Sequence, residues 1–399
     1  MATERLLGMT TQLLDRTNDT TTAAELLERA RGFAAEIDER AGESDAARSV
    51  PPDLVRRLRD AGLLALGLPR SLGGHELDPV TTMSIVEELC RADGSTGWTA
   101  MIGNSPLFFA WLDPDVAASM IGRAGEVTAS SMFGPIGRAV PDGDGGFVVD
   151  GRWPFCSACV HAEWIIQGVL VMDGDRPAQL PDGRPDWRFA YLRRDQVEIL
   201  DTWDAGGLRA TSSHDVVATG ARVRAEHLAM PMWEQAPHDT PFFGRSFFEI
   251  LTPLMAGVPL GIGRRALDEL AAIAGDVQRG GQGPSIAEDP VVQSRFGQVD
   301  LGLRAARALL VDSLGVTWAR ACRGEAPDPR ADAMSQAAGL LVLKAAVEAV
   351  DFAYTTAGGR AAYADHPLNR CFRDLHTATQ HVFFRGEAFK TVATQAFTA

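Results

Sequence analysis

The chain has 399 residues, of which 46% are hydrophobic and 23% charged, and its formal net charge is −14. A single core seldom grows beyond ~250–300 residues, so this length predicts roughly two to three domains. The acidic balance opposes binding to phosphate backbones, and we therefore expect no nucleic-acid partner.

The start of the chain shows no targeting pattern, since Met1-Ala2-Thr3-Glu4-Arg5 lacks the charged-then-apolar order of a signal peptide. No apolar run reaches the ~18 residues that a membrane span requires. The five cysteines form an odd, scattered set, unlike the disulfide framework of a secreted protein. We expect a cytoplasmic protein with reduced thiols and no membrane partner.

The first third of the sequence is predicted to be helical. Residues 1–20 are polar and predict a flexible N-terminus. Apolar residues at helical spacing and proline at first-turn positions predict helices that begin at Thr22, Pro51-Pro52, Asp78-Pro79 and Trp98. The last of these is expected to run to Trp111 after a break at Asp93–Gly97, and it carries a buried amide, Asn104.

Between Glu126 and Leu228 the hydrophobic period shortens from 3.6 towards 2, which indicates strands. Strand-like runs separated by Gly, Pro and Asp clusters lie at Val127–Met132, Phe147–Val149, Trp164–Val171, Phe189–Leu192, Val197–Leu200 and Val216–Val223. Short strands in series with turns between them predict an antiparallel sheet or a small barrel.

The last region predicts four long helices, at about Ser246–Asp276, Val291–Cys322, Ala331–Thr356 and Asn369–Ala396. Apolar stripes and short connections favour a four-helix bundle. The predicted fold is therefore α+β, with a flexible N-terminus (1–20), a helical domain (21–125), a central antiparallel β-domain (126–235) and a C-terminal four-helix bundle (236–399).

The stretch Gly151–Trp164 concentrates aromatic, small, hydroxyl and thiol residues. Its Cys156-x-x-Cys159-x-His161 pattern lacks the further ligands of a zinc site. Strand alternation would also send the two cysteines to opposite faces. We therefore expect buried thiols and no metal. Ser212-Ser213-His214-Asp215 has the letters of a catalytic triad, but neighbours on a strand point apart, so it is predicted to be a strand entry.

His381 differs from the other histidines because the predicted last helix surrounds it with apolar residues. Two interpretations stay open. It is a satisfied core residue, or it is a general base beside a buried ligand. No G-x-G-x-x-G and no G-x-x-x-x-G-K-[ST] occurs, so neither a nicotinamide nor a P-loop site is indicated.

Several motifs together resemble one family. They are Gly151-Arg152-Trp153-x-Phe155-x-Ser157, His161-Ala162-x-Trp164, Trp203-x-x-Gly206-Gly207-Leu208-Arg209-x-Thr211-x-Ser213-x-Asp215-Val216, Gly358-Gly359-Arg360 and Pro367-Leu368-Asn369-Arg370-x-x-Arg373-Asp374 followed by His381. This series, over about residues 25 to 395, resembles the acyl-CoA dehydrogenase fold. It is most similar to the branch of two-component monooxygenases that use reduced flavin from a separate reductase.

The resemblance implies that reduced FMN or FAD and O₂ form a C4a-hydroperoxide, which oxidises an aromatic, polycyclic or amine-bearing small molecule. Phe155 and Ser157 would lie along the flavin, with Trp203 nearby. Ser157 and Asn104 are the candidates to hold the peroxide, and His381 is the candidate acid or base. Arg295, Gly359 and Arg360 are candidates for the flavin phosphates across a subunit boundary of a homotetramer.

One difference from the acyl-CoA dehydrogenases favours the monooxygenase branch. Acyl-CoA dehydrogenases usually carry a catalytic Glu shortly after the Arg-Asp pair, whereas here Thr379-Gln380-His381-Val382-Phe383 has no carboxylate. Some dehydrogenases take their base from another helix, so an acyl-thioester dehydrogenase remains an alternative. A non-catalytic helical scaffold protein is the third possible function. The substrate pocket is expected to be apolar, among Phe108, Phe109, Trp111, Phe242, Phe243, Phe247 and Phe248.

Overall fold

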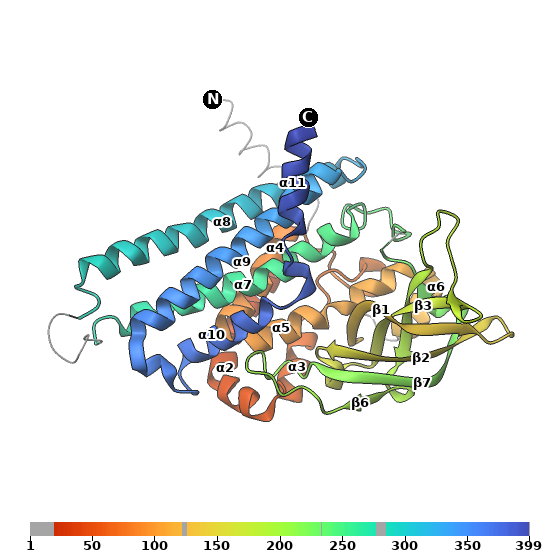
Figure 1. Cartoon of the computed structure of the whole chain (residues 1–399), viewed down its shortest axis with the longest axis horizontal. Coiled ribbons are helices and arrows are strands. Elements are labelled where there is room, and N and C mark those ends of the chain that lie inside the picture. Colours follow the sequence, from red (N-terminus) through yellow and green to blue (C-terminus); the bar gives the residue numbers. More distant parts are fainter. Residues whose placement is uncertain (1–19, 122–125, 233, 277–284, 399) are drawn as a thin grey trace.

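The computed structural model of the chain describes residues 20–121, 126–232, 234–276 and 285–398. A sheet lies at one end of the molecule and long helices extend to the other (Figure 1). The predicted flexible segment 1–20 falls almost entirely outside the described residues. Among the helices that the structure describes, none is long and apolar enough to span a bilayer.

The N-terminal helices are interrupted by two short 3₁₀ segments. The helices are α2 (Thr20–Ala47), α3 (Pro52–Asp60), α4 (Pro79–Ala92), α5 (Gly94–Gly103) and α6 (Pro114–Ile121), with η1 (Arg70–Leu72) and η2 (Ser105–Trp111). The predicted helix break lies at Asp93 alone, because its side chain accepts the Thr96 N–H and starts α5 at Gly94. The predicted helix Trp98–Trp111 is wrong in its second half, which is the 3₁₀ segment η2.

The central domain is one sheet in the order β6-β7-β2-β1-β3-β5-β8, with β4 beside β3. The strands are β1 (Ala129–Pro141), β2 (Gly146–Cys156), β3 (Trp164–Asp173), β4 (Arg176–Pro177), β5 (Trp187–Arg193), β6 (Glu198–Leu200), β7 (His214–Arg224) and β8 (Leu228–Ala229). The prediction of a purely antiparallel sheet is wrong, since β1 and β3 are parallel. After the β1–β2 hairpin, residues 157–163 and the short η3 (Cys159–His161) carry the chain across to the other edge of β1.

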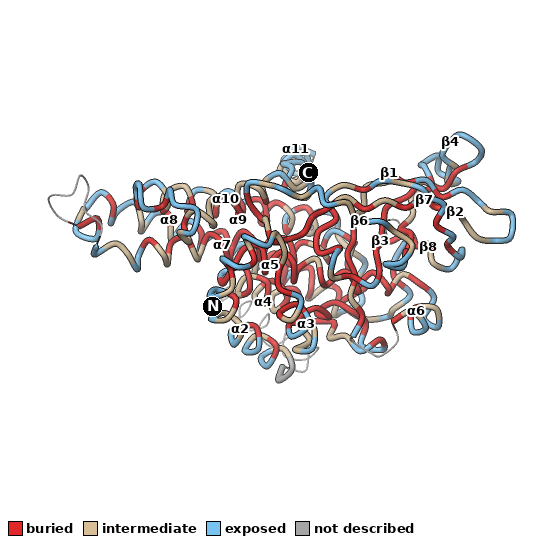
Figure 2. Tube along the Cα trace, turned by 90° about the horizontal axis from the view of Figure 1, so that it is seen from below, coloured by how far each residue is buried: buried red, intermediate tan, exposed pale blue. Residues whose placement is uncertain are grey.

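The two faces of the sheet belong to different cores, as strand alternation requires. On β3, Trp164 and Ile166 join the core shared with the helices, while Ile165 and Val169 join a second core around Trp153. Buried residues are concentrated where α4, α5 and α7 meet the strands (Figure 2). The sheet is thus held against the helices along one face.

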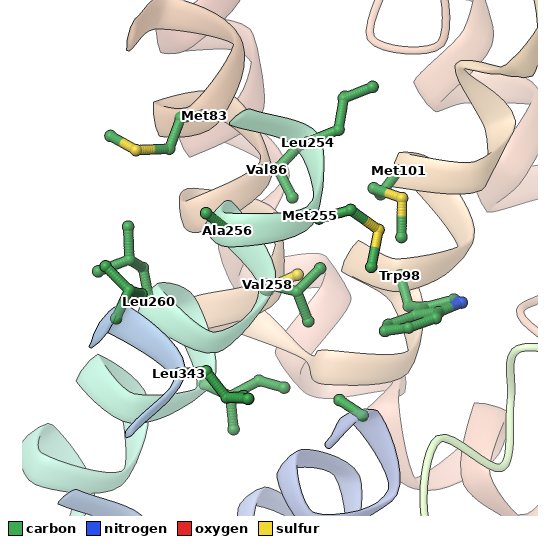
Figure 3. Packing of buried hydrophobic residues seen from close by; sticks show 14 of the residues in the cluster. Met83, Val86, Trp98, Met101, Leu254, Met255, Ala256, Val258, Leu260 and Leu343 are labelled. Atoms are coloured by element: carbon green, nitrogen blue, oxygen red, sulfur yellow. The ribbon is translucent and has the colours of Figure 1, made fainter. Parts of the chain in front are cut away.

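The C-terminal helices are α7 (Phe247–Ile273), α8 (Pro290–Cys322), α9 (Pro329–Ala357), α10 (Pro367–Ala378) and α11 (Glu387–Thr398), with η7 (Gly358–Ala362) and η8 (Val382–Phe384). The predicted fourth long helix is wrong, because the chain leaves the helix after Ala378 and turns through η8. Helix α4 packs on α7, where Gly257 and Gly261 leave no room for a Cβ beside the α4 backbone. Figure 3 shows this packing, with Met83 and Val86 of α4 close to residues of α7.

Candidate active site

Two facing loops contain a concentration of residues with positive φ. Phe155 (φ 63°) is the last residue but one of strand β2 and Ala158 (φ 58°) follows that strand, while Leu208 (φ 50°) and Ser212 (φ 47°) lie in the loop before β7. The loops are joined by the Ala158 N–H, which donates to the carbonyl of Thr211 at 2.8 Å. Non-glycine residues rarely adopt this conformation, and such strain is concentrated at functional sites.

A chain of buried hydrogen bonds connects these loops to α5. The Trp98 Nε1–H donates to Ser157 Oγ at 3.0 Å, and Ser157 Oγ lies 2.7 Å from Ser213 Oγ. Ser213 Oγ lies 2.6 Å from Thr211 Oγ1, which donates to the carbonyl of Leu208 at 2.8 Å. Figure 3 shows the Trp98 ring beside Met101 and Met255, with its nitrogen directed away from both. Ser157 is therefore oriented from two sides.

Two aromatic side chains lie next to this chain of hydrogen bonds. The Phe155 side chain is 67% exposed, although it is large and apolar. Its ring meets the half-buried Trp203 ring edge to face at 6.3 Å, and Trp203 Nε1 donates to the Leu208 carbonyl. The strained backbone thus presents an uncovered aromatic ring beside a buried hydroxyl, which fits a flat, polar-edged group such as a flavin.

His381 approaches the same place from the C-terminal helices. Its ring lies 5.5 Å from Trp98 in an edge-to-face arrangement. His381 has an extended backbone and caps η8, and its Nδ1 accepts the Phe383 N–H at 3.2 Å. Since Nδ1 is an acceptor, the neutral ring carries its proton on Nε2. Burial lowers the pKa of His381 to about 4, so the ring is neutral at pH 7.

The amide of Asn104 is fully used in local structure. Its Nδ2 donates to the carbonyls of Leu63 and Ala100, and its Oδ1 accepts the Leu66 N–H. The side chain is only 2% exposed. These bonds fix the turn between α5 and η2 and leave no amide proton for a ligand. We therefore do not propose a catalytic role for Asn104.

The predicted phosphate-binding residues lie at the far end of the helices within one chain. Arg295 pairs with Glu348, and Arg360 Nη2 donates to the carbonyl of Asp276, just beyond α7. The start of α7 packs on the sheet, where Phe247 contacts Phe133 and Phe189. Helix α7 has 27 residues, and at 1.5 Å per residue it is about 40 Å long. Within one chain, Arg360 and its neighbour Gly359 thus lie at the opposite end of α7 from the helix start that packs on the sheet.

Asp374 is a site residue that the sequence motifs contained but did not explain. Its side chain is 1% exposed, and its Oδ1 accepts the N–H of the strained Leu208 at 2.6 Å. Gly207 allows this approach, because a Cβ there would collide with the α10 backbone at Arg373. Burial and the neighbouring Asp93 raise the pKa of Asp374 to about 7. Only long-range contacts show this role, since Leu208 and Asp374 are 166 residues apart.

The two cysteines of the opening motif lie in one core, so the prediction that they face opposite sides is wrong. Strand β2 ends at Cys156, and Cys159 already belongs to η3. Burial raises the pKa of Cys156 to about 12 and that of Cys159 to about 11, so both are inert thiols. His161 lines a cavity of about 610 Å³ beside Arg48.

The aromatic residues expected to form a substrate pocket mostly form a packed core. Phe108 contacts the rings of Trp111, Phe133, Phe189 and Phe247, while Phe133 and Phe189 are stacked at 4.7 Å. Phe109, Phe242 and Phe243 are buried, and Phe248 is the exposed member. These rings hold the sheet against η2 and the start of α7.

Comparison with known proteins agrees with this architecture. The family model for the acyl-CoA dehydrogenase N-terminal domain matches residues 20–111, and that for the C-terminal domain matches residues 254–386. The chain is 30% identical over 359 residues to an indole-3-acetate monooxygenase of Pseudomonas putida, covering 90% of each chain. It is 26% identical to the HsaA oxygenase subunit of Rhodococcus jostii, a flavin-dependent monooxygenase, covering 86% of this chain and 91% of that one.

Solved structures share the fold. XiaF from Streptomyces in complex with FADH2 superposes with a TM-score of 0.86 at 21% identity and covers 99% of this chain and 98% of its own. The 3-HSA hydroxylase of Rhodococcus sp. RHA1 also has a TM-score of 0.86, at 24% identity, covering 94% and 97%. With the relatives above, these matches confirm the predicted resemblance, and the chain belongs to the acyl-CoA dehydrogenase family, in its branch of flavin-dependent monooxygenases.

Proposed function

We propose that this chain is the oxygenase component of a two-component system. It takes reduced FMN or FAD from a separate reductase and uses O₂ to oxidise an aromatic, polycyclic or amine-bearing small molecule. The observation that carries the proposal is the contact of both Ser157 and His381 with the Trp98 ring. Three segments far apart in the sequence thus bring a hydroxyl and an imidazole to one buried indole ring, and the exposed Phe155 lies two residues before that hydroxyl.

Each of these residues has a task in the proposed reaction. Reduced flavin, when bound, supplies the electrons that activate O₂. Phe155 and Trp203 orient the flat ring, and Ser157 holds its polar edge. His381 presents Nε2–H to the oxygen that is transferred or to a substrate hydroxyl. Trp98 and the buried hydroxyls close the site from behind, which keeps water from the reacting atoms.

The alternative of an acyl-thioester dehydrogenase requires a carboxylate base. The segment Thr379–Phe383 has none, and the carboxylate at the start of α7, Glu249, is buried beside Thr317 and Ser335 of α8 and α9. Asp374 is bonded to the Leu208 N–H and buried. The positions of these carboxylates favour oxygenation over removal of a substrate α-proton.

Anaerobic titration with FMNH₂ and FADH₂, followed by addition of O₂, tests the proposal. We expect one reduced flavin to bind tightly and its oxidised form weakly. Oxygen should then produce a transient absorbance that differs from free oxidised flavin. Tight binding of oxidised FAD and its reduction by an acyl-CoA without O₂ would support the dehydrogenase instead. Binding of neither redox state would support the scaffold.

We also propose a homotetramer in which Arg360 or Arg295 of one subunit holds the flavin phosphate of another. Helix α8 supports an interface, because it exposes the apolar Leu301, Leu309 and Val316. A cytoplasmic location is proposed from the five cysteines, an odd and scattered set that fits a reducing compartment.

Replacing Arg360 or Arg295 by alanine is expected to weaken reduced-flavin binding about ten- to a hundredfold, as for the loss of a charged hydrogen bond. Fluorescence titration measures the affinity, and sedimentation measures the assembly. The exposed Arg193 pairs with Asp195, and Arg193→Ala is the matched control. Unchanged affinity in both variants would remove the phosphate role.

A further inference from the structure

The hydroxyls of Ser157, Ser213 and Thr211 form a continuous chain inside the protein. All three residues are buried, at 6%, 5% and 1% exposure. The distances along the chain are 2.7 Å and 2.6 Å. Each hydroxyl has a single proton to donate and two lone pairs to accept with. The direction of one bond therefore decides the direction of the next.

One end of the chain fixes this direction, and the other end is compatible with it. At one end the Leu208 carbonyl can only accept, so the proton of Thr211 is committed to it. Thr211 then accepts from Ser213, and Ser213 accepts from Ser157. At the other end the indole N–H of Trp98 can only donate, and Ser157 Oγ accepts it. Every proton in the chain points away from Ser157 towards Leu208.

Ser157 is left with one free lone pair and no free proton. We propose that this fixed direction makes Ser157 a hydrogen-bond acceptor towards the flavin, and that Ser213 and Thr211 thereby select the reduced ring. The inference rests on the proposed function. Reduced flavin carries a hydrogen on N5 and can donate to Ser157, whereas oxidised flavin has only a lone pair there. Ser213 and Thr211 are positioning residues, because they act through Ser157.

Selection of this kind suits an enzyme that receives reduced flavin and must release the oxidised product. A neutral hydrogen bond that forms in one redox state and not in the other changes relative affinity by about tenfold. The direction of these hydrogen bonds also predicts which substitution removes the preference for reduced flavin. Without Ser213 as acceptor, the proton of Ser157 is free to turn towards the N5 of an oxidised ring.

The test compares Ser213→Ala with the matched control Ser130→Ala. Ser130 is also a buried serine beside Ser157, but its Oγ donates to the Ser157 carbonyl and lies outside the chain. The dissociation constants of oxidised and of anaerobically reduced FMN and FAD are measured by fluorescence for each protein. Ser213→Ala should tighten oxidised-flavin binding about tenfold and change reduced-flavin binding less than twofold. Ser130→Ala should keep the ratio of the two constants.

Thr211→Val is a second variant, since it removes the donor at the end of the chain and preserves side-chain shape. It should also lower the preference for reduced flavin. A ratio that stays at the wild-type value in both chain variants would overturn the inference, as would equal weakening of both redox states, which indicates structural damage. If the wild-type protein binds neither form, the proposed function itself fails. If it binds reduced flavin and the ratio of the two dissociation constants is the same in the Ser213 and Thr211 variants as in the wild type, only the inference fails.

Discussion

Replacing His381 by alanine is expected to lower product formation by about 10²-fold or more, with reduced-flavin affinity within twofold of wild type. The physical reason is the loss of a fixed donor in a buried site, and donors of this kind contribute roughly 10²–10³-fold to catalysis. The uncoupled reaction should release hydrogen peroxide in place of product. Product and peroxide formed per reduced flavin consumed are the quantities to measure. Normal, coupled oxidation by His381→Ala would remove the assignment.

The His381→Gln variant distinguishes between two roles of His381, that of a hydrogen-bond donor and that of a general base. Glutamine can present an N–H near the position of Nε2, but it cannot take up a proton at neutral pH. If His381 acts through its Nε2–H, the Gln variant should recover much of the activity that the Ala variant loses. Because burial lowers the pKa of His381 to about 4, its neutral form persists above that value. Its titration should leave no step in the pH profile between about pH 5 and 8. A Gln variant as inactive as Ala would favour proton removal by the ring.

Hydrophobic periodicity predicted most elements near the site, but not the break that places His381. The segment Asn369–Ala396 has apolar residues at helical spacing and reads as one helix. In the structure Thr379 ends α10, and the His381 side chain caps η8. The cap turns the ring out of the helical direction towards Trp98. A local pattern could not predict this, because the deciding contact joins residues far apart in the chain.

In the sheet, too, the local sequence pattern predicted some strands, whereas the strand pairing depends on long-range contacts. The strand-like runs covered most of β3, β5, β6 and β7, but only the first residues of β1 and β2. The two-residue strands β4 and β8 are too short for any periodicity. The parallel pairing of β1 with β3 depends on where residues 157–163 cross, which alternation does not specify. The motif residues of the site came from the family resemblance, whereas the roles of Trp98 and Asp374 were shown only by contacts.

Asp374→Asn is expected to change how stability depends on pH. Burial and the neighbouring Asp93 raise the pKa of Asp374 to about 7 in the folded protein, whereas the unfolded chain releases this proton near pH 4. The folded state therefore holds a proton that the unfolded state has lost. Its contribution to stability is complete below about pH 4 and is lost as pH rises to about 7.

Asparagine at this position stays neutral and still offers an oxygen to the Leu208 N–H. Between pH 5 and 7 the wild type should lose roughly 1 kcal/mol per pH unit that the variant keeps. Urea unfolding of both proteins at pH 5, 6, 7 and 8 measures this difference. The groups that face Asp374 from α2, α4, α7, α10 and the α4–α5 junction are Asp45, Cys90, Asp93, Arg265, Arg370, Cys371 and Arg373.

Asp93→Asn is the matched variant, because asparagine also caps helices well and the change removes only the charge beside Asp374. With that charge gone, Asp374 should release its proton at a lower pH, and the loss of stability should be complete below pH 7. Arg370, whose Nε lies 3.3 Å from Asp93 Oδ1, would then be free to compensate Asp374. Parallel pH profiles for the wild type and Asp374→Asn would show that Asp374 is ionised in the folded protein. The Leu208 loop, and with it Trp203 and Thr211, would then be held by a charged carboxylate.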